Sequence, residues 1–161
     1  FVIHGLSAQL FVLFAALLVL LFVVLYDMRH TIVPMRPVVA FIVLALVYRA
    51  VLFTDTLSVG LALMVAGVAA SVFLAFHLFS RGRAMGLGDT PVVLGLSLLT
   101  GPAFVVPGIL FSFWIGALYG IVVLASTRPG HRMGIEVPFV PFLALGFLLA
   151  YFTGWNPLPI F

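Results

Sequence analysis

The chain has 161 residues, of which 65% are hydrophobic and only 7% are charged. This composition excludes a soluble globular domain, because the chain carries too little polar surface to cover one. The formal net charge of +3 comes from arginine alone, since lysine is absent, and in a membrane protein so small an excess indicates topology rather than a nucleic-acid partner.

Continuous apolar runs predict an all-α, polytopic membrane protein, whereas a barrel would show alternating ones. We expect a bundle of six transmembrane helices with a short fourth span, forming a single membrane-embedded domain over residues 1–161. The fourth span has roughly 11 residues of about 1.5 Å each, too few to cross about 30 Å of hydrocarbon. Asp89, at its start, should therefore lie below the membrane surface. The predicted spans are residues 7–26, 37–53, 57–79, 90–100, 107–126 and 137–152.

Small residues recur at four-residue spacing in the predicted third and fifth spans. In the fifth span, which we expect to begin at Pro107, the row is Gly108, Ser112, Gly116 and Gly120. Such a row lets helix backbones approach closely in lipid. We therefore predict that this row packs against another helix.

The arginines predict an orientation. Arg49 is the one arginine on its side of the membrane, and we expect its side chain to reach the interface. Since arginine-rich loops stay in the cytoplasm, both termini should lie outside a bacterial-type inner (cytoplasmic) membrane. The other arginines lie in the loops between spans 1–2, 3–4 and 5–6: Arg29, Arg36, Arg81, Arg83, Arg128 and Arg132.

Asp27 and Asp89 are two of only four acidic residues, and each lies where an apolar run meets an arginine-containing loop. Ionisable residues at membrane depth are costly and indicate functional sites. Two carboxylates that share a proton can activate water for peptide hydrolysis, one as base and the other as acid. The sequence does not assign these two roles. Taken singly, Asp27 is more simply an interfacial residue and Asp89 an N-cap of the fourth helix.

Six further residues are candidates for binding substrate or supporting the aspartate pair. The two glycines allow unusual backbone angles, so an extended peptide can lie against them. For the charged residues, a solvated loop or an interfacial position is the simpler interpretation. The six are Gly86, Gly88, Arg29, His30, Glu136 and Pro138.

No metal site or cofactor is predicted. The chain has no cysteine, and two aspartates with distant histidines lack the spacing of metal ligands. His4 and His77 are isolated histidines near the expected interfaces, and we assign neither a function.

Three segments resemble the type IV prepilin peptidases, and together they cover nearly the whole chain in the order of that family. Residues 26–34, from Tyr26-Asp27 to Pro34, resemble its first aspartate motif, D-x-x-x-x-x-I-P after an apolar span. Gly86-Leu87-Gly88-Asp89 matches its GxGD motif. Residues 134–146, which contain Pro138-Phe139-Val140-Pro141-Phe142, look like its PFxPFLALG segment.

The resemblance implies a six-helix intramembrane aspartyl endopeptidase with Asp27 and Asp89 as its catalytic pair. Such enzymes remove the short basic leader from type IV prepilins, preflagellins or pseudopilins, on the cytoplasmic side and just before the hydrophobic helix of the substrate. The family usually has a lysine where this chain has Pro91. Many members also carry a cysteine-rich methylase region, which is absent here, so we expect a peptidase-only member or a piece of a longer chain. The oligomeric state stays open.

Two other classes share parts of this pattern. Presenilin and signal-peptide-peptidase proteins also use Tyr-Asp and Gly-x-Gly-Asp, but they have nine spans and a late Pro-Ala-Leu motif, where this chain reads Pro141-Phe142-Leu143. A small transporter could instead use the two aspartates to bind a cation or relay protons. A purely structural membrane subunit would leave the aspartate pair unexplained.

Overall fold

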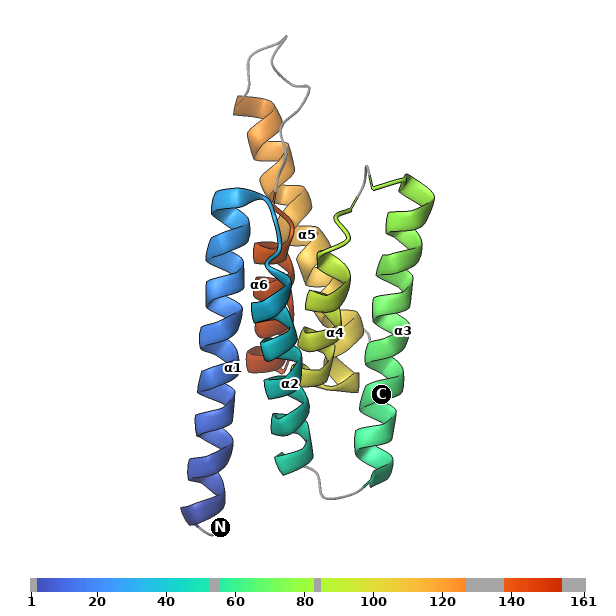
Figure 1. Ribbon diagram of the computed structural model, residues 1–161. Coiled ribbons are helices and arrows are strands. Elements are labelled where there is room, and N and C mark those ends of the chain that lie inside the picture. Colours follow the sequence, from blue (N-terminus) through green and yellow to red (C-terminus); the bar gives the residue numbers. More distant parts are fainter. Residues whose placement is uncertain (1–2, 53–55, 83–84, 127–137, 155–161) are drawn as a thin grey trace.

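The computed structural model describes residues 3–52, 56–82, 85–126 and 138–154. Regular structure within these ranges is entirely helical, which confirms the predicted all-α class (Figure 1). Consecutive helices run in opposite directions along the bundle. The helices are α1 (Ile3–His30), α2 (Met35–Leu52), α3 (Thr56–Ser80), α4 (Asp89–Thr100), α5 (Pro102–Ser126) and α6 (Val140–Thr153).

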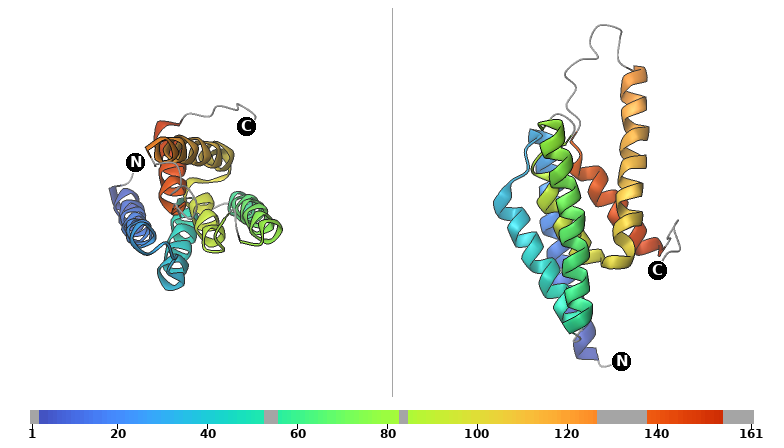
Figure 2. Two further views of the ribbon diagram at one scale, coloured as in Figure 1. Left: turned by 90° about the horizontal axis from the view of Figure 1, so that it is seen from above. Right: turned by 90° about the vertical axis from the view of Figure 1, so that its right-hand side faces the viewer.

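Helix α4 lies in the middle of the bundle, with α2 and α3 as its main neighbours and α5 and α6 also in contact (Figure 2). Nine of its 12 residues are buried. A helix this short leaves polar backbone groups at membrane depth, which is tolerated where protein surrounds them. The surrounding helices therefore allow α4 to begin with a charged residue.

Three described helices are long and apolar enough to cross a membrane, namely the stretches Ala8–His30, Thr56–Ser80 and Pro102–Val123. Helices α4 and α6 are apolar but shorter. Helix α2, with 18 residues, spans roughly 27 Å at about 1.5 Å per residue, close to the hydrocarbon thickness. The chain is thus a multi-pass membrane bundle with two short helices.

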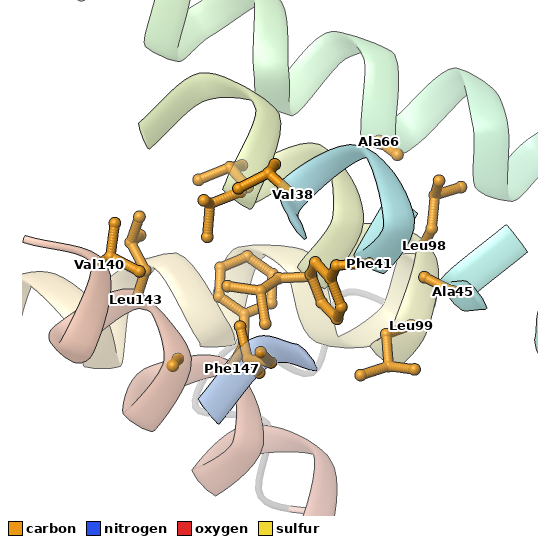
Figure 3. Packing of buried hydrophobic residues seen from close by; sticks show 14 of the residues in the cluster. Val38, Phe41, Ala45, Ala66, Leu98, Leu99, Val140, Leu143 and Phe147 are labelled. Atoms are coloured by element: carbon orange, nitrogen blue, oxygen red, sulfur yellow. The ribbon is translucent and has the colours of Figure 1, made fainter. Parts of the chain in front are cut away.

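The core contains residues of all six helices, with α5 contributing Val105 (Figure 3). Phe41 of α2 and Phe147 of α6 are both fully buried. Phe41 packs so closely on Gly95 of α4 that a Cβ there would lie 2.5 Å from its ring. The glycine therefore lets α2 and α4 approach each other.

The row of small residues in α5 packs against α6 from Gly108 to Gly116, where a Cβ would lie 3.6 Å from the Phe142 ring. Gly108 accommodates the Phe147 ring, since a Cβ at Gly108 would lie 2.7 Å from it, and Ser112 lies directly against Gly146. Gly120 has no such neighbour among the described residues. The predicted packing row is therefore confirmed from Gly108 to Gly116 and wrong at Gly120.

Two helix boundaries differ from the prediction. Helix α1 continues through Asp27 to His30, so the first aspartate lies within a helix rather than just beyond one. Helix α5 begins at Pro102 and contains Pro107. The turn before it is made by Gly101, whose φ of 90° suits glycine.

The expectation that Arg49 reaches the membrane interface is wrong. Its side chain is buried, and its guanidinium lies against Gly101, where a Cβ would be 2.6 Å from it. Gly101 is the C-cap of α4, and a cation at that position is favourable to the helix dipole. Beside it, the hydroxyl groups of Tyr48 and Tyr151 are 3.0 Å apart and join α2 to α6.

Candidate active site

Asp27 lies in the last turn of α1 with only 4% of its surface exposed. The backbone N–H of Val140, the first residue of α6, donates a hydrogen bond to its carboxyl group. Among the described residues, its Oδ2 atom is buried without a hydrogen-bond partner. An unpartnered buried oxygen is uncommon and needs an explanation, such as a functional role or a bound water.

Asp89 is the first residue of α4 and is 5% exposed. Its Oδ2 accepts a hydrogen bond of 3.1 Å from the backbone N–H of Gly86. The N-cap of α4 is Gly88, with no side-chain cap. The simpler interpretation of Asp89 as an N-cap is therefore wrong, and its carboxyl group faces back toward the preceding segment.

The two carboxyl groups meet where three helix ends converge. Asp89 interacts electrostatically with Asp27, and Val140 adds the start of α6 to the same place. In Figure 1 the C-terminal end of α1 and the N-terminal ends of α4 and α6 point toward the same end of the bundle. Two buried carboxyl groups within electrostatic range of each other disfavour double ionisation, so together they tend to hold one proton.

The glycines of the GxGD segment act differently from the prediction. Neither Gly86 nor Gly88 has a positive φ, so unusual backbone angles do not explain them. A Cβ at Gly88 would lie 2.5 Å from the Cβ of Val33, in the connection between α1 and α2. A Cβ at Gly86 would make ordinary contact, 3.5 Å from Asp89 Oδ2. Gly88 is thus needed for close approach, whereas Gly86 is exposed beside the aspartate.

The charged neighbours predicted to support the pair lie outside it. Arg29 and His30 are both exposed, and the His30 ring packs on Tyr26 with 4.5 Å between centroids. Within the described ranges, no hydrogen bond or ion pair joins either side chain to the Asp27 carboxyl group. Glu136 lies outside those ranges, and its predicted role stays a prediction.

Two residues that interact with the aspartates, Val140 and His77, were not predicted to do so. Val140 acts through its backbone N–H, so its residue type did not indicate this role, and the sequence predicted only the start of a helix nearby. His77 of α3 bonds through Nδ1 to the carbonyl oxygen of Met85, at 2.9 Å, and interacts electrostatically with Asp89. As an isolated histidine in an apolar run, it had no sequence partner that would indicate this role.

An apolar groove of about 530 Å³ lies between α1 and α6, and neither aspartate lines it. Its walls are α1 from Leu17 to Met28 and the α6 side from Pro138 to Phe152, with Tyr119 of α5. Met28 follows Asp27 directly in the chain, and Pro141 follows Val140, so one end of the groove is formed by neighbours of the residues that make the site. Pro138 is half-buried at this end. No group of three or more metal-ligating side chains occurs among the residues that the structure describes.

The fold and the site together define a membrane helix bundle with a buried pair of aspartates at one end. The sequence pattern of the type IV leader peptidase family matches residues 12–121, a stretch that contains both aspartates and about two thirds of the chain. The chain belongs to this family. That membership favours the prepilin peptidases over the presenilin-like alternative.

One similar curated protein is the prepilin leader peptidase/N-methyltransferase of Bacillus subtilis (strain 168). The two are 28% identical over 150 residues, which cover 93% of this chain and 58% of that protein. The chain thus spans less than two thirds of its relative. No solved structure matches the chain.

Proposed function

We propose that the chain is an aspartyl endopeptidase that cleaves the basic leader from prepilin-like or preflagellin-like precursors at the cytoplasmic membrane face. The observation that carries the proposal is the pair of buried aspartates, Asp27 and Asp89, brought together from α1 and α4. Membership of the type IV leader peptidase family supports the same activity.

The chemistry follows from one proton shared by two carboxyl groups. The ionised aspartate takes a proton from water while the water oxygen attacks the scissile carbonyl carbon, and the protonated aspartate donates its proton to the carbonyl oxygen. The resulting gem-diol collapses: the aspartate that took the proton from water donates it to the leaving nitrogen and the C–N bond breaks. The other aspartate takes back a hydroxyl proton as the carboxyl group forms, which restores the shared proton. The unpartnered Oδ2 of Asp27 is a suitable acceptor for the attacking water.

The groove supports a peptide substrate with an apolar segment after the cleaved bond. A peptide in lipid must satisfy its backbone internally, so this segment is helical. The α1 wall spans residues 17 to 28, roughly 17 Å at about 1.5 Å per residue, which equals about three helical turns. We propose that the hydrophobic helix of the precursor lies there, with the preceding peptide bond at the aspartates.

The distribution of charge supports the cytoplasmic location. Arg29 in the last turn of α1, Arg36 in the first turn of α2 and Arg81 directly after α3 lie at the aspartate end of the bundle. By the positive-inside rule this end faces the cytoplasm, and the termini lie on the other side of the inner membrane.

The direct test is incubation of the purified chain, in liposomes, with a prepilin-like precursor, followed by mass measurement of the products. We expect one cut between the basic leader and the hydrophobic segment. Cleavage at scattered positions, or none with several such precursors, would contradict the proposed activity.

Filling the groove should weaken substrate binding. Leu145 lines the groove and is 55% exposed, so Leu145→Trp should raise KM and lower kcat/KM by about tenfold, with kcat little changed. Leu61→Trp is the matched control, because Leu61 of α3 is also 55% exposed but lies outside the groove. Equal effects of the two substitutions would contradict the groove as the substrate site.

A further inference from the structure

His77 is tied to the second aspartate through a single peptide group. Its Nδ1 bonds to the carbonyl oxygen of Met85 at 2.9 Å, and the N–H of the same Met85–Gly86 peptide donates to Asp89 Oδ2 at 3.1 Å. The path therefore runs from the His77 ring through one C=O and one N–H to the carboxyl group. Hydrogen bonds in such a chain strengthen one another.

The proton on the ring can be assigned from its partner. A carbonyl oxygen only accepts, so Nδ1 must carry a proton and donate it to Met85. This holds for the cationic ring and for the neutral tautomer with its proton on Nδ1, which the bond to the carbonyl oxygen favours. The bond therefore persists whatever the charge on His77.

Both ends of the path are held in place. At the end of α3, the N–H of Gly82 and the hydroxyl of Ser80 donate to the His77 carbonyl oxygen at 2.9 and 3.2 Å. Gly82 has a φ of 75°, a conformation suited to glycine. The Met85 side chain is buried in the core. The histidine thus lies on a capped helix end and reaches across to a peptide whose side chain is anchored.

We infer that His77 is a positioning residue of the aspartate site, which orients the Met85–Gly86 peptide so that its N–H points at Asp89. The inference rests on the proposed function insofar as Asp89 is catalytic. Without the His77 donor, the peptide is free to rotate and withdraw the only backbone N–H recorded on the Asp89 carboxyl within the described ranges. The sequence offered no sign of this link, since the histidine lies eight residues before Met85.

Three substitutions of His77 distinguish the effect of its hydrogen-bond donor from the effect of its side-chain size. Asparagine places an amide nitrogen near the Nδ1 position and keeps the bond. Glutamine places its amide near Nε2, and leucine has no donor, so both lose the bond. We expect His77→Leu and His77→Gln to lower kcat of precursor cleavage by about five- to tenfold, the scale of one hydrogen bond, with KM little changed. His77→Asn should stay within about twofold of the unmodified chain.

A second readout needs no substrate. In protein labelled with ¹⁵N-glycine, the Gly86 amide resonance is assigned by its absence in Gly86→Ala. It should move upfield in the leucine and glutamine variants and stay in place in the asparagine variant. Ser71→Ala is the control, because Ser71 is exposed on α3 and bonds only within its helix, to Gly67. An unmoved resonance in His77→Leu would overturn the inference.

The two readouts separate failure of the inference from failure of the proposed function. A moved resonance with unchanged kcat overturns the positioning role. A moved Gly86 resonance together with a lowered kcat in His77→Asn also overturns it, because a hydrogen-bond donor at this position would then not be sufficient. If the unmodified chain cleaves no precursor, the proposed activity fails and the resonance alone decides whether His77 orients the peptide.

Discussion

Asp27→Asn and Asp89→Asn should each lower the rate of precursor cleavage by at least about 10³-fold, since either change removes one partner of the shared proton. The substitutions keep the size of the side chain. At position 89 the asparagine Oδ1 can still accept the bond from Gly86 N–H, which is 3.1 Å long in the aspartate. The measurement is single-turnover cleavage in liposomes, so that substrate binding does not limit the rate.

The same variants should fold at least as well as the unmodified chain. Two buried carboxyl groups within electrostatic range disfavour each other's ionised form, and a neutral amide relieves this interaction. Thermal unfolding in detergent should show an unchanged or raised Tm, as is common when an active-site group is replaced. A lowered Tm accompanying the loss of cleavage would mean that the aspartates act on the fold.

Gly88→Ala is expected to have the second largest effect. The new Cβ would lie 2.5 Å from Val33 Cβ and 2.6 Å from its Cγ2. Because the closest atom is the Val33 Cβ, whose position is fixed by the backbone, a rotamer change cannot clear the contact and the backbone must move. We expect unfolding to become easier by about 1–3 kcal/mol and cleavage to fall by at least about 100-fold, since the adjacent Asp89 shifts.

A matched series isolates the contact. Gly86→Ala should leave the stability unchanged, because its Cβ would lie 3.5 Å from the nearest side-chain atom. Combining Gly88→Ala with Val33→Gly should restore stability relative to Gly88→Ala alone, whereas Val33→Ala keeps the offending Cβ and should restore less. If Gly88→Ala gives the same unfolding free energy alone, with Val33→Gly and with Val33→Ala, the contact between residues 33 and 88 does not explain why position 88 is glycine.

The composition and the motifs predicted the helical class, the six helices and the pairing of the two aspartates at one end. They did not predict which charged side chains are buried between the apolar helices. Arg49 was expected at the interface because arginine is costly in lipid, yet it is buried against Gly101 at the end of α4. The protein groups that surround Arg49 come from other helices, and hydropathy along the chain does not identify them.

The same limit of sequence-based prediction applies to the contacts within the site. The GxGD pattern predicted Asp89, but the need for Gly88 comes from Val33, a residue more than fifty positions earlier. The N–H groups that reach the carboxyls belong to Val140 and Gly86, and backbone donors have no residue type to recognise. The row from Gly108 to Gly120 matched the packing rule throughout, but its last member, Gly120, has no partner among the described helices, because α5 and α6 diverge toward the aspartate end (Figure 2).

The measurement that tests the central claim most directly sets cleavage against ion flux in the same liposomes. The unmodified chain, Asp27→Asn and Asp89→Asn are each supplied with a prepilin-like precursor, and product formation and proton or cation flux are recorded together. We predict one cleavage product from the unmodified chain, none from either variant, and no flux in any sample. Cleavage that persists in both variants, or flux that depends on the two aspartates without cleavage, would contradict the assignment of this pair as a peptidase site.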